Sequence, residues 1–486
     1  MSSKGRPEGE YRSAQREGPA IRSKGRPEGE CRSAQREGGQ TSAPRIAVVG
    51  GGWAGCAAAI AIADAGLDVE LFEAAPALGG RARRVTRAGF KLDNGQHLVL
   101  GAYRATRALL ARLHVTPPVT WRPLALASFA SGQRDALALA TWRLPAPLHL
   151  LMAILCARGL RIDERIATVR WFARLRRAGY RCDPLLTVAQ LTASLPPIVA
   201  TQLWHPLCIA ALNTPPARAS AQVFANVLRA AFGEGADGAD VMLPASDLGV
   251  LVADATLRRL QADGHTVELK AAATIAEARA GHVTIDVHGV TCRYAGVIVA
   301  VGPHQLSRAI APSLIARERT IGNAIDQVDR LAWEPITTAY LGYAQHVELP
   351  EGLIRLDDRP GQWLFARPDI VASAGADAPP VAMMVAVVLS THGTYDTLAH
   401  EVLAATVDAQ LRACRANWPP LAWSQVIEEK RATYACTPTA TRPVAGMLGP
   451  GIALAGDYTD DEFPATLEAA VRSGQRAAAA LMATLR

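Results

Sequence analysis

The most regular pattern of apolar positions in this chain lies between residues 45 and 81. Four consecutive apolar residues, 46–49, form a short run that is typical of a buried parallel strand. An alanine-rich segment, 54–65, favours helix, and Gly66 follows it as a helix stop. A second apolar run, 69–72, predicts another strand. The segment is therefore expected to fold as strand, helix and strand.

Three glycines follow the first predicted strand, at the G-x-G-x-x-G spacing. Gly50 allows a sharp turn, Gly52 lets the backbone approach a pyrophosphate, and Gly55 lets helix and strand pack closely. Glu73 ends the second strand, where a carboxylate can hold the ribose hydroxyls of an adenosine. The pattern predicts a dinucleotide site, and the simpler alternative is an ordinary glycine-bearing turn.

A second glycine pair follows the acidic residue, in the sequence Leu78-Gly79-Gly80-Arg81. This stretch resembles the "GGR" sequence of the FAD-containing amine oxidase and phytoene desaturase superfamily. Gly80 can bring backbone close to a ligand, and Arg81 can neutralise a phosphate. Because a domain that binds only NAD does not need this element, we expect FAD.

A more specific resemblance begins at Asp93-Asn94-Gly95-Gln96-His97. These residues resemble the hydroxysqualene dehydroxylases of hopanoid biosynthesis, also called squalene-associated FAD-dependent desaturases. The resemblance continues in four further stretches and covers residues 44–486: 101–103 (GAY), 212–216 (LNTPP), 433–438 (TYACTP) and 454–459 (LAGDYT).

The resemblance implies an FAD-dependent enzyme that reductively removes the hydroxyl of hydroxysqualene and gives squalene. Loss of an allylic hydroxide leaves a delocalised cation, so the reaction needs a hydride, a dry apolar cavity and a proton donor. His97 is the first candidate for the proton donor and Asp93 the second. An ordinary hydrogen-bonded loop histidine is the alternative for His97. Gly95 suggests a close approach of backbone to a ligand.

The resemblance also implies cofactor contacts far from the first glycine motif. In flavoproteins of this class, the backbone at the strand that contains Val267 meets the adenine. Asp457, after Gly456, holds the ribityl–pyrophosphate region. The last helix, which we expect over 464–485, directs its N-terminus, with Thr466, towards the flavin. Ala469 stands where the family usually has glycine, which puts the close packing there in doubt.

Apolar periodicity predicts the remaining elements. Leu/Ala/Arg segments separated by proline pairs predict a helical insertion over 104–235. The further elements that we expect are helices at 247–260 and 397–414, strands at 265–269, 297–301, 338–343, 362–367, 381–390 and 452–455, and a hairpin at 283–294.

We therefore predict an α/β (α+β) fold with a Rossmann-type FAD-binding domain and an inserted helical and antiparallel-sheet substrate domain. The FAD-binding domain is expected to be discontinuous, over 44–103, 236–310 and 432–486. The substrate domain takes 104–235 and 311–431.

Residues 1–43 contain a near-perfect duplication, 3–18 and 23–38, that is rich in glycine, arginine, glutamate and serine. Such a composition cannot bury a core, so we expect a disordered tail. A basic interaction tail is the functional alternative. The segment has no apolar region of the kind found in a secretory signal.

The net charge of +7 and the pI of about 9.1 suit a nucleic acid, a membrane surface or only an arginine-rich chain. No nucleic-acid-binding motif accompanies the charge, so we expect no nucleic acid partner. The eight cysteines are scattered without a C-x-x-C pair, which argues against a metal site and fits a reducing cytoplasm. No apolar run is long enough to predict a spanning helix.

The segment 144–181 is the candidate membrane contact. An apolar stretch, 144–157, precedes eight arginines that stand among two acids and the aromatic residues Trp171, Phe172 and Tyr180. This pattern suits a monotopic membrane contact, and a core helix followed by a solvated one is the alternative. We expect a cytoplasmic protein on the inner face of the cell membrane, with a long-chain isoprenoid substrate and other squalene-synthesis enzymes as candidate partners.

Two other functions use the same features. An oxidative polyene or carotenoid desaturase, or an amine oxidase, would take a hydride from its substrate instead. A non-catalytic lipid-carrying protein of the same fold, similar to the Rab GDP-dissociation inhibitors, would need no flavin.

Overall fold

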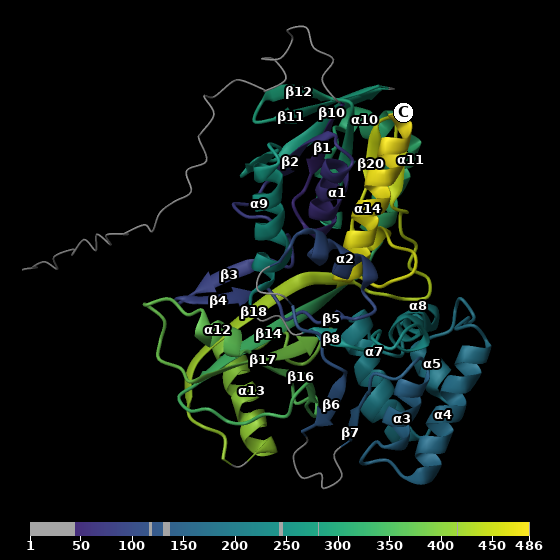
Figure 1. Ribbon diagram of the computed structural model, residues 1–486, viewed down its shortest axis with the longest axis vertical. Helices are drawn as coiled ribbons and strands as arrows, with labels where there is room; N and C mark the ends of the chain where they lie inside the picture. The colour runs from purple at the N-terminus through teal and green to yellow at the C-terminus, as the bar shows by residue number, and fades with distance from the viewer. Residues whose placement is uncertain are drawn as a thin grey trace, which may run out of the picture. The chain divides into compact units, whose positions relative to one another are not determined.

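The computed structural model describes residues 44–115, 119–129, 137–242, 246–279, 281–415 and 417–485 (Figure 1). The predicted disordered tail, residues 1–43, lies outside the described residues. The described chain forms one compact unit, and the boundaries that we predict within it stay a prediction. No helix among the described residues is long and apolar enough to cross a membrane.

A six-stranded sheet confirms the predicted nucleotide-binding architecture. Its order is β19-β20-β13-β1-β2-β9, and β1 lies between two parallel neighbours, β2 and β13. β1 is buried along almost its whole length, which explains its continuous apolar run. The strands are β1 (Arg45–Val49), β2 (Asp68–Glu73), β9 (Thr266–Leu269), β13 (Gly296–Val299), β19 (Gly446–Gly449) and β20 (Ile452–Leu454).

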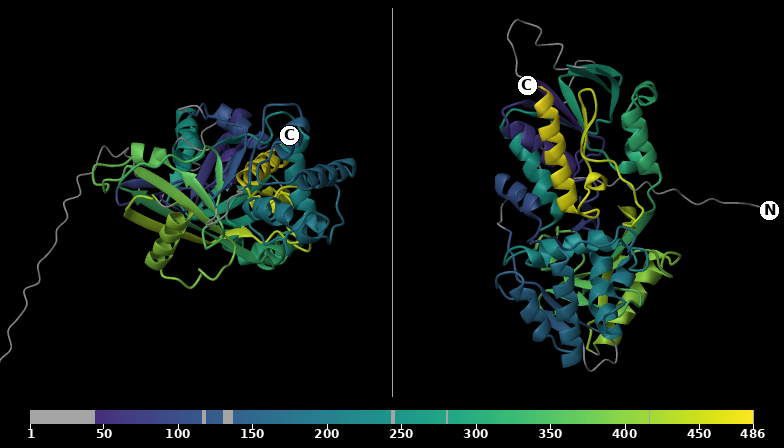
Figure 2. Two further views of the ribbon diagram at one scale, coloured as in Figure 1. Left: turned by 90° about the horizontal axis from the view of Figure 1, so that it is seen from below. Right: turned by 90° about the vertical axis from the view of Figure 1, so that its right-hand side faces the viewer.

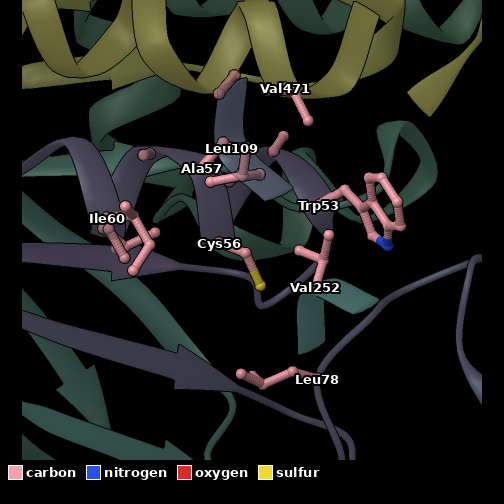
Figure 3. Close-up of a cluster of buried hydrophobic side chains, with 14 of the residues drawn as sticks. Trp53, Cys56, Ala57, Ile60, Leu78, Leu109, Val252 and Val471 are labelled. Atoms are coloured by element: carbon pink, nitrogen blue, oxygen red, sulfur yellow. The ribbon is translucent and has the colours of Figure 1, made fainter. Parts of the chain in front are cut away.

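Two helices, α1 (Trp53–Asp64) and α14 (Leu467–Thr484), pack against each other and this sheet. A Cβ at Gly474 of α14 would lie 2.1 Å from the carbonyl oxygen of Ala54, so only glycine permits this approach. Figure 3 shows the apolar cluster around the contact, with Ala57 of α1 and Val471 of α14. Ala469, where we expected looser packing, is fully buried.

A seven-stranded sheet forms the second layer, in the order β18-β14-β17-β16-β15-β6-β7. It is antiparallel except where β15 and β6 run parallel, so the predicted antiparallel sheet is confirmed. Helix α13 (His400–Cys414) packs against β14 and β18. The strands are β6 (Ala125–Ser128), β7 (Ala138–Ala140), β14 (Trp333–Tyr343), β15 (Leu353–Arg355), β16 (Trp363–Ala366), β17 (Met383–Ser390) and β18 (Leu421–Tyr434).

The predicted helical insertion is correct except at β6 and β7. These two strands complete the edge of the seven-stranded sheet, because β6 pairs with β15. The remaining segments between 104 and 235 are α2 (Arg104–Arg112), α3 (Leu148–Leu155), α4 (Ile162–Arg177), α5 (Val188–Thr192), α6 (Pro197–Val199), the π-helix η1 (Ala200–Trp204), α7 (His205–Leu212), α8 (Ala221–Leu228) and the π-helix η2 (Arg229–Gly233).

The other elements connect these layers. The predicted hairpin is confirmed as β11 (His282–Val287) and β12 (Val290–Tyr294), which β10 (Ala273–Arg279) extends to three strands. The predicted helix 247–260 is a π-helix, η3 (Gly249–Ala253), followed by α9 (Asp254–Ala262). Short elements make up the rest: β3 (Arg84–Arg87), β4 (Phe90–Asp93), β5 (Val99–Leu100), β8 (Val241–Met242), η4 (Pro303–Gln305), η5 (Ser307–Ala309), α10 (Pro312–Arg317), α11 (Arg319–Asp329), α12 (Pro368–Ala372) and η6 (Asp457–Thr459).

Candidate active site

The three glycines of the motif, two before α1 and one within it, differ in how much room the protein leaves for a side chain. Gly50 has φ +106°, and a Cβ there would lie 2.6 Å from the carbonyl oxygen of Ala300. A Cβ at Gly55 would lie 1.8 Å from the carbonyl oxygen of Gly50. A Cβ at Gly52, in contrast, would have only the Cα of Gly80 within 4 Å, at 3.9 Å. The packing of the protein does not require Gly52, so the space beside it fits a ligand such as a pyrophosphate.

Glu73 links the end of β2 to this glycine loop. Its Oε2 accepts a hydrogen bond from the Gly51 N–H at 2.7 Å, and its Oε1 accepts one from the Ala75 N–H at 2.8 Å. Each carboxylate oxygen has capacity for a second hydrogen bond, and the side chain is only partly buried. The predicted contact of Glu73 with ribose hydroxyls is compatible with this geometry and stays a prediction.

Arg81 joins the Gly79–Gly80 turn to the predicted second part of the cofactor site. Its guanidinium donates to the carbonyl oxygen of Ala432 at 2.6 Å and to Oδ1 of Asp457 at 2.5 Å. Burial by itself lowers the pKa of Arg81, but the carboxylates of Asp457 and Glu429 raise it above its usual value. Arg81 therefore stays charged beside the glycine loop, where phosphate neutralisation is expected.

The last helix begins later than predicted. Thr466 has an extended backbone, and its hydroxyl accepts a hydrogen bond from the Ala469 N–H at 3.2 Å, so it is the N-cap of α14. The expectation that Pro464 lies in the first turn is wrong, because the chain becomes helical only at Leu467. Gly456 and Asp457 lie before this helix, and Ser473 of α14 accepts a hydrogen bond from the Gly456 N–H. The structure thus brings Gly456, Asp457 and Arg81 together.

Val267 lies on the edge strand of the six-stranded sheet. It pairs with Leu71 of β2, two residues before Glu73. This position, next to the strand that carries the predicted ribose ligand, is where the adenine contact is expected. The contact itself stays a prediction.

Asp93, the second candidate for the proton donor, is completely buried. Its Oδ1 accepts a hydrogen bond from the Leu248 N–H at 2.7 Å, and its Oδ2 lies 3.1 Å from a guanidinium nitrogen of Arg367. Burial raises the pKa of the Asp93 carboxyl from 3.8 to about 6, against the lowering effect of Arg367. The side chain has no solvent-accessible surface in this arrangement, so the contacts observed for Asp93 are those to Leu248 and Arg367, and its role as a proton donor stays a prediction.

Arg367 is a residue that the sequence did not reveal. It is 2 % exposed and donates hydrogen bonds to Gln96 Oε1 at 2.7 Å and to both carboxylate oxygens of Asp369. The network fixes the Asp93–His97 loop to the seven-stranded sheet. A lone arginine at the end of a predicted strand gives no signal of such a role, because Asp93 and Gln96 lie far from it in the sequence.

His97, the first candidate for the proton donor, has its Nδ1 2.7 Å from the carbonyl oxygen of Gly95. Since a carbonyl only accepts, Nδ1 carries the hydrogen and Nε2 has the free lone pair. Burial, with the positive charges of Arg81 and Arg367, lowers the pKa of His97 from 6.5 to about 4. At neutral pH the side chain is therefore a neutral hydrogen-bond acceptor at Nε2, whereas the predicted proton donation requires the imidazolium form.

A cavity of about 220 Å³ lies beside the end of β18. Tyr434 lines this cavity. The cavity is close to the predicted cofactor site in the sequence of β18, because Ala432, two residues before Tyr434, accepts a hydrogen bond from Arg81 through its carbonyl oxygen. The Tyr434 hydroxyl accepts a hydrogen bond from Arg442, and the Arg442 guanidinium lies 4.9 Å from the ring centre. The lining residues are Cys182, Pro184, Ser220, Gln222, Val223, Tyr434, Cys436, Thr437, Pro438, Ala440 and Arg442.

Two of the motif stretches from the sequence meet next to this cavity. Asn213 ends α7 with φ +44°, and its Nδ2 donates to Thr433 Oγ1 at 2.9 Å. The hydroxyl of Thr214 accepts a hydrogen bond from the Cys436 N–H at 2.9 Å. Leu212–Pro216 and Thr433–Pro438 are thus parts of one junction between the helical insertion and the seven-stranded sheet.

Comparison with known proteins agrees with this geometry. The family model for flavin containing amine oxidoreductases matches residues 226–482, and that for NAD(P)-binding Rossmann-like domains matches residues 48–113. Three curated relatives are named hydroxysqualene dehydroxylase. The one from Rhodopseudomonas palustris is 28% identical over 90% of this chain and 98% of its own length. The one from Sinorhizobium fredii is 26% identical over 89% of this chain and 96% of its own length.

Solved structures share the fold at low sequence identity. An oxidoreductase from Methanosarcina mazei has a TM-score of 0.68 and 13% identity, covering 91% of this chain and 99% of its own. Cyclohexylamine oxidase from Brevibacterium oxydans has a TM-score of 0.62 and 15% identity, with the same coverage of 91% and 99%.

Proposed function

The chain belongs to the flavin containing amine oxidoreductase family, and from this premise we propose that it removes the hydroxyl group of hydroxysqualene by reduction, giving squalene. As an FAD-dependent oxidoreductase, it has the cofactor that such a reduction requires. The observation that carries the proposal is the similarity to relatives named hydroxysqualene dehydroxylase, which extends over 96–98% of their length.

The chain's own groups fit the cofactor. The open backbone at Gly52, the charged Arg81 and the N-terminus of α1 suit the pyrophosphate, and Glu73 suits the adenosine ribose. Asp457 and the capped N-terminus of α14 suit the ribityl chain and the flavin ring. When bound and reduced, FAD would supply a hydride to carbon, and the proton that the reduced cofactor also releases would balance the departure of the hydroxyl group as water.

His97 is the residue that we assign to the substrate hydroxyl. Its neutral Nε2 can accept a hydrogen bond from an alcohol and so hold the C–O bond in one orientation. The Arg367 network supports this role, because it fixes the loop that carries His97 to the sheet. On the face of the sheet beneath the loop, the fully buried Thr338 accepts a hydrogen bond from the Gln96 N–H, and the fully buried Tyr340 donates one to the Asp93 carbonyl.

Anaerobic mixing of the chemically reduced protein with hydroxysqualene tests the proposal. The yellow absorbance of oxidised flavin should return as squalene forms, in equal amounts, because one hydride leaves the cofactor for each product molecule. An oxidative desaturase or amine oxidase would leave the flavin reduced under these conditions. A protein that purifies colourless and does not take up FAD would point to a lipid carrier and contradict the proposal.

A matched variant tests the assignment of His97. The His97→Ala variant should purify with a full complement of FAD. Its rate of squalene formation should fall by up to about ten-fold, which is the effect expected from the loss of one hydrogen bond. Unchanged turnover in this variant would remove His97 from the site and leave the reaction itself intact.

A further inference from the structure

Helix α4 presents one side to the protein core and the opposite side to solvent. Trp171, Phe172 and Leu175 are buried, and the ring of Trp171 packs against that of Trp204 in a tilted arrangement, with ring centres 5.0 Å apart. Together with Tyr180, these aromatic side chains belong to the core, and the predicted membrane contact of the segment 144–181 stays a prediction. Any membrane contact of α4 has to come from its solvent side.

The solvent side of α4 carries apolar side chains in its first half. Ile162 is 73% exposed and Ile166 is 41% exposed. These are large apolar groups on a helix whose opposite side already supplies the core contacts. Since burying an isoleucine in an apolar environment is favourable by about 1.5–3 kcal/mol, two exposed ones at a four-residue spacing require an explanation.

The second half of the same side carries only positive charge. Arg170, Arg174, Arg176 and Arg177 are exposed and form no ion pair with any residue that the structure describes. Positions 162, 166, 170 and 174 follow one another at four-residue spacing, so the isoleucines and arginines form one surface. We call these six residues the α4 outer face.

Helix α3 also carries exposed apolar side chains. It lies beside α4 (Figure 1), and Figure 2 shows α3 and α4, drawn in blue, at the edge of the helical insertion. Leu148 and Leu155, at the two ends of α3, are 47% and 39% exposed, and Trp142 before it is 49% exposed. Helices α3 and α4, together with Trp142 just before α3, therefore carry several of the large exposed apolar side chains among the described residues.

We propose that the α4 outer face, with the exposed side of α3, docks on an anionic membrane surface. The helix would lie in the plane of the interface, with Ile162 and Ile166 among the lipid chains and the four arginines at the headgroups. A second copy of this chain fits less well, because a two-fold contact would bring the unpaired arginines of both copies together. The source of attraction is thus lipid phosphate, with apolar insertion as the second contribution.

This docking explains how the proposed substrate would reach the enzyme, since hydroxysqualene and squalene are long hydrocarbons that reside in the bilayer. In this respect the inference rests on the proposed function. Vesicle binding is measured without substrate, however, so its failure and a failure of the dehydroxylation assay are distinguishable.

Cosedimentation of the FAD-loaded protein with vesicles tests the docking. We expect binding to mixed phosphatidylglycerol and phosphatidylcholine vesicles, much weaker binding to phosphatidylcholine alone, and partial release by high salt. Changing Arg170, Arg174, Arg176 and Arg177 to glutamine should weaken binding by up to about 600-fold, because each basic residue near an anionic surface contributes roughly five-fold. Ile162→Ser with Ile166→Ser should weaken the binding that remains at high salt.

Two control proteins match these changes elsewhere on the surface. Arg279, Arg293, Arg319 and Arg330, all exposed, can be changed to glutamine with the same loss of charge. Val402→Ser replaces an apolar side chain that is 52% exposed on α13. Both controls should bind as the parent does, and all variants should keep their FAD.

Equal loss of binding in the arginine variant and its charge control would overturn the proposal, because net charge alone would then explain it. Unchanged binding in the isoleucine variant would do so as well. A third result would also overturn the proposal. If the parent protein is a dimer in solution, and the isoleucine changes make it a monomer without changing its binding to vesicles, the α4 outer face contacts a second copy of the chain.

Discussion

At the scale of single residues, two glycines of one motif show what the fold needs and what the cofactor needs. Gly55 must be glycine for packing, since a Cβ there would collide with the carbonyl oxygen of Gly50 at 1.8 Å. Gly52 has room within the protein, with its nearest neighbour at 3.9 Å, and an allowed backbone with φ −68°. The constraint on Gly52 is therefore set by the ligand.

The change Gly52→Val should consequently separate folding from cofactor binding. We expect a folded protein, with a thermal midpoint close to that of the parent apoprotein, that purifies without flavin because the side chain occupies the pyrophosphate space. Flavin absorbance and circular dichroism measure the two properties. Gly55→Val is the matched control and should fail to fold; a fully yellow Gly52 variant would place the cofactor elsewhere.

Asp93 gives the protein a specific dependence on pH. Burial raises the pKa of its carboxyl from 3.8 in the unfolded chain to about 6. Between these values the folded state holds the proton and the unfolded state does not, so the stabilising contribution is complete below pH about 4 and is lost as the pH rises through about 6. Ionised Asp93 then depends on Arg367, 3.1 Å away.

The change Asp93→Asn should remove this part of the pH dependence, because an amide does not titrate. We expect the thermal midpoint of the parent, relative to the variant, to fall between pH about 4 and about 6 and to stay level above it. Both proteins are measured with saturating FAD. If the thermal midpoints of the parent and the variant differ by the same amount at every pH measured, the pKa of Asp93 is not raised in the folded protein.

At the scale of elements, the end of α7 holds the helical insertion on the seven-stranded sheet. Asn213 adopts the left-handed conformation, with φ +44°, which turns the chain out of the helix. Its amide group donates to Thr433 Oγ1 and to the carbonyl of Pro335 at 3.2 Å, and its Oδ1 accepts from the Thr391 N–H at 3.0 Å. One side chain thus joins α7, β14, β18 and the end of β17.

Asn213→Ala should destabilise the protein by about 2–4 kcal/mol, because buried partners lose their hydrogen bonds and alanine is strained at positive φ. Asn213→Gly is the matched control, because it loses the same hydrogen bonds but adopts positive φ without strain. It should therefore be more stable than the alanine variant by about 1 kcal/mol. Urea unfolding measures both. Equal stability of the alanine variant and the parent would contradict the assigned role of this junction.

At the scale of the whole molecule, the cofactor groups come from distant parts of the chain. Gly52 and Arg81 belong to the first quarter, Val267 to the middle, and Asp457 to the end. The ion pair of Arg81 with Asp457 already joins two of these parts without a ligand. FAD that contacts all three would bind only the folded arrangement and would stabilise it by mass action.

Removal of FAD should therefore lower the thermal midpoint, and returning it should raise the midpoint with concentration. At a free concentration a thousand times the dissociation constant, the gain is about 4 kcal/mol. NAD, which lacks the flavin, serves as the control ligand and should give a much smaller shift. A midpoint that is independent of added FAD would contradict the site.

The amino-acid sequence by itself determined the nucleotide-binding layer. Local sequence patterns were sufficient there. Apolar runs predicted β1, β2 and β13, and an alanine-rich segment predicted α1. The spacing of Gly50, Gly52 and Gly55 could be interpreted because the conformation of a turn depends on neighbouring residues in the chain. The antiparallel character of 338–390 followed from apolar strands in the same way. Errors at this level were small, such as the start of α14 at Leu467 instead of Pro464.

Only the tertiary structure decided the surroundings of Asp93, His97 and Arg367, because burial and partners from distant segments set a pKa and an orientation. The same holds for α4, where the fold buried Trp171 and Phe172 and left Ile162 and Ile166 in solvent. A periodic pattern indicates that a helix has two sides. It does not say which side meets the core when both carry apolar residues, since that depends on which side finds a complementary surface.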